Sequence, residues 1–334
     1  MMEEGGTTAS ASALGRQAFE IEPEAKQSGF GPLQAKRRLS VAAASLAGIA
    51  LLAAFWPSTS RDAGLLQAGF EFAVQKPRQG LPVPRNQTIP RTLHVVVENC
   101  TKATWEKIQQ DMVLADVRDF RVRCHDAVER AAYVQAWFPQ YADFYLTLPL
   151  PIMKADVFRY MVLYREGGFY VDDDVDLFPS FRGHFLREQH KSFILGWERR
   201  SKYKPIGSWC MDGGGMLCNS LAMWAIGLAP GHPYMLDVIE TIQEFFNRTH
   251  TDLSREGQHA VLDHTGPVVF SARLLLHIDL EDILGIEAFG CGQLHSHSPP
   301  CFPSDAAIWL RHRFEGKWRS QVPPWAMAFL RLLP

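Results

Sequence analysis

Residues 154–180 read KADVFRYMVLYREGGFYVDDDVDLFPS, and this stretch decides the fold. Large apolar residues recur from Val157 at the spacing of one helical face, which predicts a buried helix. Gly167 and Gly168 then predict a helix end in left-handed backbone, and the aromatic and β-branched residues after them predict a strand. The stretch therefore predicts a helix, a tight break and a short strand that ends in acids.

Four carboxylates follow within five residues, at Asp172, Asp173, Asp174 and Asp176. Side chains alternate in an extended chain, so we expect Asp173 to point away from the other three. Nothing basic nearby in the sequence neutralises this charge, and hard oxygen ligands suit magnesium, manganese or calcium. The glycine and glutamate of an EF-hand loop are missing. A solvated acidic turn is the alternative to a metal that bridges two carboxylates and a diphosphate.

The same stretch resembles the sugar-transferase family named for its DXD motif. Members carry Asp-x-x-Arg-Tyr on a helix and then Gly-Gly-x-Tyr-x-Asp-x-Asp. This chain fills every motif position, with Asp156, Arg159, Tyr160, Gly167, Gly168, Tyr170, Asp172 and Asp174. The resemblance implies an α/β fold of the GT-A type, which is a Rossmann-like nucleotide-sugar-binding domain. It also implies a nucleotide-sugar donor and retention of configuration at the transferred sugar.

Three later segments sharpen the resemblance: PGHP at 230–233, TGPVVF at 265–270 and RHRFEGKW at 311–318. They look like segments of the α-1,6-mannosyltransferases that start the outer chain of N-glycans. The match runs from about residue 89 to 318. It departs at Lys317, where the family usually has serine, and after His94, where a nearby tryptophan is usual. We expect His94 itself to be a core histidine.

The resemblance also assigns roles in donor binding. It implies that Asp156 contacts the sugar hydroxyls and that Arg159 contacts the sugar and the diphosphate. Tyr160 is grouped with these donor-binding residues, and Asp172 holds the donor ribose and sugar or binds the metal through water. The sequence identifies no nucleophile, so a front-face mechanism stays open.

The metal is predicted to be Mn²⁺ or Mg²⁺, held directly by Asp174 with Asp172 beside it. His312 follows a predicted strand at 306–310, where GT-A enzymes supply a late metal ligand. Imidazole suits ions of the manganese class and is a poor ligand for calcium. We therefore expect His312 to complete the site, and a purely structural histidine is the alternative.

Alternating strand and helix patterns open the globular part, with strands expected at 92–97 and 120–124 and helices at 102–115 and 127–137. This order predicts a parallel α/β sheet. The chain contains no G-x-G-x-x-G or Walker A sequence, which excludes the dinucleotide and P-loop classes. A net charge of −2 does not favour a nucleic-acid partner.

Three later expectations are less specific. A strand is expected at 192–197, and a helix pair at 223–247 around the PGHP segment. The glycine-rich segment 209–219 lies where the family lines the acceptor side, and it offers Asp212 and Asn219 as weak candidates there.

An uncharged apolar segment at 39–56 predicts a transmembrane anchor, with a cleaved signal peptide as the alternative. The basic residues at 36–38 place the N-terminus in the cytoplasm under the positive-inside rule. We therefore expect a disordered cytoplasmic tail at 1–38, a stem at 57–88 and a catalytic domain at 89–334.

The six cysteines and three N-x-S/T sequons all follow the predicted anchor, which suits an oxidising lumen. The sequons are at Asn86, Asn99 and Asn247. Cys100 and Cys124 stand at the ends of two predicted strands, and Cys291 and Cys301 flank a short proline-rich loop. We expect at least one disulfide, with these two pairs as the candidates. No spacing indicates zinc.

These observations lead to three functional hypotheses. The first is a Golgi α-mannosyltransferase, single-pass type II, that transfers mannose from GDP-mannose to a glycan in N-glycan processing. The second is an α-galactosyl, α-N-acetylglucosaminyl or sphingolipid mannosyl transferase that acts on glycolipid. The third is an inactive lumenal glycan-binding protein, which the filled motif argues against.

Overall fold

The computed structural model describes residues 87–201, 203–204, 209–210, 216–248, 258–289, 308–317 and 319. The chain divides into two compact units, Met1–Ala50 and Leu51–Pro334, and every described residue belongs to the second. The predicted tail, anchor and most of the predicted stem lie outside the described residues. No helix in the described part is long and apolar enough to cross a membrane. The domain boundaries therefore stay predictions.

The helices and strands are, in chain order, β1 Thr92–Val96, α3 Lys102–Leu114, β2 Arg121–His125, α4 Ala127–Trp137, α5 Pro139–Thr147, α6 Pro151–Glu166, β3 Gly168–Asp172, β4 Val175–Leu177, α7 Phe181–Glu188, β5 Phe193–Ile194, β6 Trp197–Arg200, β7 Trp209–Cys210, β8 Met216–Leu217, β9 Asn219–Leu221, β10 Ala225–Leu228, α8 Pro233–Arg248, α9 Gln258–His264, α10 Pro267–Leu274, a 3₁₀ turn Leu280–Asp282, α11 Ile286–Phe289 and β11 Leu310–His312.

A five-stranded mixed sheet organises these elements, in the order β2-β1-β3-β10-β5. β1 pairs in parallel with β2 and β3, as the alternation of strands and helices predicts. β10 runs antiparallel to both β3 and β5. Shorter antiparallel pairs join β11 to β4, β6 to β9 and β7 to β8. The predicted α/β class with a parallel sheet is therefore confirmed, with an antiparallel extension.

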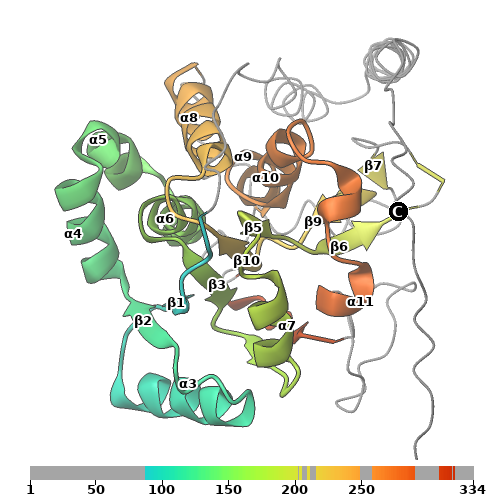
Figure 1. The fold of residues 1–334 in the computed structure, drawn as a ribbon. Helices are drawn as coiled ribbons and strands as arrows, with labels where there is room; N and C mark the ends of the chain where they lie inside the picture. Colours follow the sequence, from blue (N-terminus) through green and yellow to red (C-terminus); the bar gives the residue numbers. More distant parts are fainter. Residues whose placement is uncertain are drawn as a thin grey trace, which may run out of the picture. The chain divides into compact units, whose positions relative to one another are not determined.

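Side chains alternate across β1 and β3 and build a hydrophobic cluster on each face of the sheet. Leu93, Val95 and Phe169 pack with α3, α7 and α11. Val96 and Tyr170 pack with α4, α5, α6, α8 and α10. Figure 1 shows α6 and α8 on one side of these strands, with α3 and α7 on the other. The layered core leaves the ends of the strands free to carry polar side chains.

The break between α6 and β3 forms as predicted. Gly167 and Gly168 have φ angles of 64° and 102°, which favour glycine. A Cβ atom on Gly168 would lie 2.6 Å from the Thr92 carbonyl oxygen, so the strands could not approach as closely. The chain thus reverses at Gly167 and Gly168 and passes directly from α6 into β3. This reversal brings Asp156 on α6 near Asp172 at the carboxyl end of β3.

Two expectations about later elements are wrong. The sequence predicts a helix pair at 223–247, but its first half contains β10, and only α8 is helical. The four residues of β10 are fully buried beside β3, and a short buried apolar run has no periodicity that separates strand from helix. The strand predicted at 192–197 is two strands, β5 and the start of β6.

The predicted disulfide between Cys100 and Cys124 is confirmed. It ties the segment after β1 to the neighbouring strand β2, where both cysteines lie at the carboxyl end of the sheet. Cys218 is also disulfide-bonded. Cys291 and Cys301 lie outside the described residues, so the second candidate pair stays a prediction.

His94 is a core histidine, as expected. It is fully buried, and its Nδ1 and Nε2 atoms lie 3.0 Å from His125 Nε2 and from the Gly167 carbonyl oxygen, respectively. An Nε2–H that donates to the carbonyl leaves Nδ1 to accept from His125. The pair therefore links β1, β2 and the break after α6 through neutral imidazoles.

Candidate metal and donor site

The four acids lie on a turn and not on one extended segment. β3 ends at Asp172, residues 173 and 174 form the turn, and β4 begins at Val175. The expected alternation of faces along one extended segment is therefore wrong, because a turn at 173–174 interrupts the extended chain. Asp172 and Asp174 nevertheless come together, while Asp176 pairs with Arg311 and Arg313.

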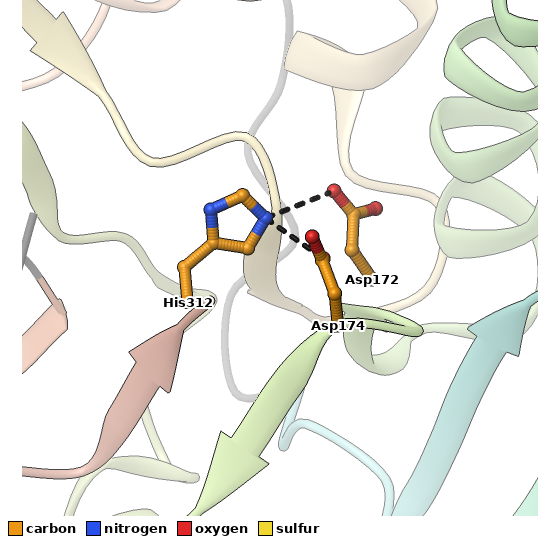
Figure 2. A group of neighbouring side chains, drawn as sticks. All are labelled: Asp172, Asp174 and His312. Atoms are coloured by element: carbon orange, nitrogen blue, oxygen red, sulfur yellow. Dashed lines mark ion pairs between the residues drawn. The ribbon is translucent and has the colours of Figure 1, made fainter. Parts of the chain in front are cut away.

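β11 carries His312 to these two acids. The strand pairs antiparallel with β4 and sets His312 opposite Val175. His312 Nε2 lies 2.9 Å from Asp174 Oδ1 and 4.0 Å from Asp172 Oδ2. Figure 2 shows this nitrogen directed between the two carboxylates. Asp172, Asp174 and His312 therefore meet at one point, although His312 is 140 residues beyond Asp172 in the sequence. The resemblance to the family grouped the same three residues.

The backbone after β11 fixes the same turn. The N–H of Arg313 donates to the Asp174 carbonyl oxygen at 2.9 Å, and the N–H of Glu315 donates to Asp174 Oδ2 at 3.0 Å. Between them Phe314 adopts a φ of 53°, which is uncommon for a large L residue. Its ring meets the His312 imidazole edge-on, with centroids 3.9 Å apart. The segment after β11 thus holds both Asp174 and His312 in place.

Asp172, Asp174 and His312 fit a divalent cation. One ligand atom from each residue lies within 4.8 Å of the others. Two carboxylate oxygens and one imidazole nitrogen are a donor set for manganese-class ions, whereas calcium prefers oxygen alone. Burial would raise the pKa of Asp174, but the hydrogen bond and charge of His312 and the Glu315 N–H hold the pKa below its ordinary value. Asp174 is therefore ready to ligate as a carboxylate.

The other two acids are neutralised by basic residues that are remote in sequence. Asp176 pairs with Arg311 and Arg313. Asp173 accepts from Lys317 at 3.0 Å. The sequence near the acids supplies no basic partner, and the fold supplies three from β11 and the residues that follow it.

Lys107 on α3 also reaches the turn, where it donates to the Asp173 carbonyl oxygen at 2.8 Å. Lys317 is the position that departs from the family pattern, and its ammonium group pairs with Asp173 and with Glu315. The departure thus adds a cation to the rim of the acidic turn.

Asp156 and Arg159 form a buried network beside the turn. Arg159 Nη2 lies 2.7 Å from Asp156 Oδ1 and 3.4 Å from Asp172 Oδ1, and Nη1 donates to the Met223 carbonyl oxygen at 3.0 Å. Thr265 donates its hydroxyl to Asp156 Oδ2 at 2.8 Å. Both Asp156 and Arg159 are 3% exposed. The network ties α6 to β3, to the start of β10 and to the TGP segment.

Burial sets the protonation of this network. It raises the pKa of Asp156 to about 7, against the lowering effects of Arg159 and the Thr265 hydroxyl. Burial also raises the pKa of Asp172, although Arg159, His312 and the Tyr170 hydroxyl act the other way. Tyr170 donates to Asp172 Oδ1 at 2.6 Å. The pKa values of the two candidate ligands, Asp172 and Asp174, are thus shifted in opposite directions.

The remaining sequence candidates are Tyr160, Asn219 and Asp212, and the structure describes the first two. Tyr160 is fully buried, donates its hydroxyl to the Thr265 carbonyl oxygen and stacks on Phe270. Asn219 is buried in β9 and accepts from the Ser201 N–H. Asp212 lies outside the described residues. The proposed donor role of Tyr160 and the acceptor roles of Asp212 and Asn219 stay predictions.

Three residues near the site have no role in the sequence interpretation. Thr265 belongs to the TGP segment, which signalled the resemblance without a stated contact. Trp224, the residue before β10, stacks on His312, with centroids 4.9 Å apart and an interplanar angle of 10°. Glu198 is a 7%-exposed carboxylate on β6. Its one signal was an acid that directly follows the apolar run FILGW.

A cleft of about 270 Å³ opens beside the acidic turn, between α3 and the sheet. Its lining includes Thr104, Lys107 and Asp111 from α3, with Asp172 and Lys317 at the acidic end. A larger hollow lies at the amino ends of β1 and β2, and no residue of the acidic turn lines it. Ligands of open α/β sheets bind at the carboxyl ends of the strands, so the smaller cleft is the better candidate for the donor nucleotide.

Comparison with known families identifies the segment that carries this site. Residues 95–192 match the family described as the glycosyltransferase sugar-binding region containing DXD motif. These residues belong to the DXD glycosyltransferase family. The match covers β1 through α7, and so it includes Asp156, Arg159 and both acids of the DXD sequence. The resemblance stated from the sequence is confirmed.

Curated proteins that are similar to this chain include mannosyltransferases. The initiation-specific alpha-1,6-mannosyltransferase of Schizosaccharomyces pombe is 28% identical in an alignment of 201 positions, which covers 52% of this chain and 49% of the relative. Inositol phosphoceramide mannosyltransferase 3 of the same organism is 28% identical over 140 residues, 42% of this chain and 32% of the relative. The chain thus spans about half of the first relative and about a third of the second.

Among solved structures, the PaToxG glycosyltransferase aligns over 65% of this chain and 77% of its own, with 14% identity and a TM-score of 0.30. At that score the alignment does not bear on the fold, which rests here on the sheet order and strand directions.

Proposed function

We propose that this protein is a metal-dependent α-mannosyltransferase of GT-A type that uses GDP-mannose and retains configuration at the transferred sugar. The observation that carries the proposal is the meeting of Asp172, Asp174 and His312 beside the Asp156–Arg159 network. The four acidic and basic residues at 156–174 lie inside the family segment, and β11 brings His312 to them from outside it. The names of the relatives support mannose as the sugar and an α-1,6 linkage, and we propose an N-glycan as the acceptor.

In this proposal Asp174 and His312 hold Mn²⁺ or Mg²⁺ directly, and Asp172 completes the set. Bound there, the ion would neutralise a departing nucleoside diphosphate and act as a Lewis acid. Lys107 and Lys317 stand at the mouth of the cleft, where their charges favour an anionic nucleotide. In this proposal the two aspartates and the histidine bind the ion, and the two lysines attract the phosphates of the nucleotide.

Arg159 has a second task in the proposal. Its guanidinium already bonds Asp156, Asp172 and the Met223 carbonyl, so it orients the two carboxylates. Although burial alone would lower the pKa of Arg159, Asp172 and the groups around it raise that pKa, and Arg159 stays charged. A fixed cation beside Asp172 offsets the cost of bringing two carboxylates together before an ion binds.

We place the enzyme in the Golgi as a single-pass type II membrane protein with a lumenal catalytic domain. The support is the uncharged segment at 39–56, its basic flank and the cysteines and sequons that follow it. The Cys100–Cys124 disulfide agrees with an oxidising compartment.

A second candidate is transfer of mannose to an inositol-containing sphingolipid. It is favoured by the inositol phosphoceramide mannosyltransferase among the relatives. This candidate keeps the donor, the metal and the site, and it changes the acceptor alone.

The test is a donor and acceptor screen of the purified full chain in detergent with Mn²⁺. GDP-mannose, UDP-galactose and UDP-N-acetylglucosamine are each offered with a high-mannose N-glycan and with inositol phosphoceramide. We expect transfer from GDP-mannose to the N-glycan, lost with EDTA and lost in Asp174→Asn. Transfer to the lipid alone selects the second candidate. Transfer from a UDP-sugar alone, or full activity in EDTA, refutes the proposal.

A further inference from the structure

Three polar groups lie next to the metal site. Nδ1 of His312 and Nε1 of Trp224 are buried, and neither has a hydrogen-bond partner among the described residues. Glu198 is a nearly buried carboxylate. Buried polar groups are nearly always paired, so the two unpaired nitrogens and the buried acid near them need an explanation.

The three groups are neighbours. The Trp224 indole stacks on the His312 imidazole, with nearly parallel planes. The Glu198 carboxylate interacts with the Trp224 indole N–H, and His312 is its strongest charged neighbour. This contact does not have the geometry of a full hydrogen bond, because Nε1 has no hydrogen-bond partner among the described residues. The order in space is therefore carboxylate, indole, imidazole, metal position.

The backbone directs Glu198 toward this stack. β6 pairs with β9, and the register shifts between Trp197 and Arg199, so Glu198 is the residue at the irregularity. Such bulges re-aim a side chain and are frequent next to active sites. Burying an acid there is costly unless the acid has a task, since burial raises the pKa of Glu198 against the influence of His312.

A histidine that ligates a metal is ordinarily oriented by a hydrogen bond from its other ring nitrogen. His312 faces the acids with Nε2, and its Nδ1 has no such partner among the described residues. Its ring is instead held between the face of Trp224 and the edge of Phe314. Whatever fixes the indole of Trp224 therefore also fixes the plane of the metal ligand.

We propose that Glu198 is a positioning residue of the metal site, which accepts from the Trp224 indole N–H and so holds the indole against His312. Glu198 does not ligate the ion, since it lies outside the cluster of ligand atoms. It acts through one aromatic ring on another. The inference rests on the metal site of the proposed function and does not depend on the donor sugar.

The experiment measures the dissociation constant for Mn²⁺ alone, by electron paramagnetic resonance of the free ion, on the full chain in detergent. Glu198→Gln keeps an acceptor oxygen at the same reach but removes the charge. Glu198→Asp keeps the charge but withdraws it by one methylene. Trp224→Phe keeps a stacking ring but removes the N–H. Glu166→Gln, a part-buried acid at the far end of α6, is the matched control.

We expect Glu198→Asp and Trp224→Phe each to weaken Mn²⁺ binding by about 10–100-fold, the range for loss of an outer partner of a metal ligand. Glu198→Gln and Glu166→Gln should stay within about threefold of the wild type. The double variant Trp224→Phe/Glu198→Asp should bind Mn²⁺ no more weakly than the weaker of the two single variants. Both substitutions break the same contact between Glu198 and Trp224, so their effects should not add. The melting temperature is followed in parallel, and a purely structural role would move it without changing the affinity.

The opposite pattern overturns the proposal. If Glu198→Gln binds weakly and Glu198→Asp binds normally, the charge acts on the ion directly and the indole is not the link. Normal binding in Trp224→Phe has the same consequence. A wild type that binds no Mn²⁺ removes this inference together with the metal site. A wild type that binds Mn²⁺ but transfers no sugar refutes the proposed function and leaves the inference standing.

Discussion

Replacing Asp174 with asparagine should strongly weaken metal binding and leave the fold intact. Asp174 Oδ1 lies 2.9 Å from His312 Nε2, and Oδ2 accepts from the Glu315 N–H at 3.0 Å. An asparagine oxygen can accept the same N–H, while its amide group donates to Nε2 of a His312 that carries its proton on Nδ1. Both contacts of the metal-free protein therefore survive, and we expect stability to change by about 1 kcal/mol or less.

The cost appears when an ion binds, because the amide carries no charge and ligates a dication poorly. Asp174 is the acid of the cluster that has no lysine or arginine ion pair in the described residues. We expect Mn²⁺ affinity to fall at least as far as for loss of an outer partner, about 10–100-fold. Sugar transfer at fixed Mn²⁺ should fall in parallel. Manganese titration by electron paramagnetic resonance and urea unfolding measure the two effects separately.

Asp173→Asn is the matched control, because it makes the same change at the neighbouring residue of the same turn. Its carboxylate pairs with Lys317, which is 61% exposed, and such exposed pairs contribute about 0–1 kcal/mol. We expect Mn²⁺ affinity within about threefold of the wild type. If Asp173→Asn loses the metal while Asp174→Asn keeps it, Asp173 is the ligand and the geometry argued for this turn is wrong.

Three further predictions concern other parts of the chain. Burial lowers the pKa of His94 to about 4 and that of His125 to about 3, from 6.5; the unfolded chain therefore binds more protons below about pH 6.5. We expect each histidine to cost about 2 kcal/mol of stability between pH 7.5 and 5, and a His125→Gln variant with an unchanged pH slope in urea unfolding would contradict this. Replacing Cys100 and Cys124 by serine should cost about 2–5 kcal/mol, and free thiols at both sites in unreduced, alkylated protein would rule out the disulfide. Protease treatment of sealed microsomes should spare the part that follows 39–56, and its digestion without detergent would refute the proposed topology.

The sequence predicts the centre of the fold well because local rules decide it. The helix face after Val157 and the two glycines at 167 and 168 specify α6, the break and β3 without help from the rest of the chain. β10 was missed because its four buried residues have no pattern of their own, and pairing with β3 decides their conformation. Tertiary pairing thus overrides the local reading where a segment is short.

The site shows the same division. The resemblance selected Asp172, Asp174 and His312, and the structure brings these three together. The alternation argument for the acids failed because a turn at 173–174 breaks the extended chain. Glu198 could not be predicted, since its importance comes from a register shift in β6 and from the stack of Trp224 on His312. Neither feature has a signal in the residues themselves.

The charges around the turn explain why one place among four acids suits an ion. Arg159 lies beside Asp172, Lys317 pairs with Asp173, and two arginines around β11 pair with Asp176. Asp174 instead faces an imidazole and a backbone N–H, which satisfy its hydrogen bonds without supplying a fixed cation. Among these four acids, Asp174 therefore offers a dication the carboxylate that is least compensated by lysine or arginine. Arg159 holds Asp172 beside it, within reach of the same ion. The family sequence supplies the acids, and β11 with the residues that follow it determines which of them remain available to the metal.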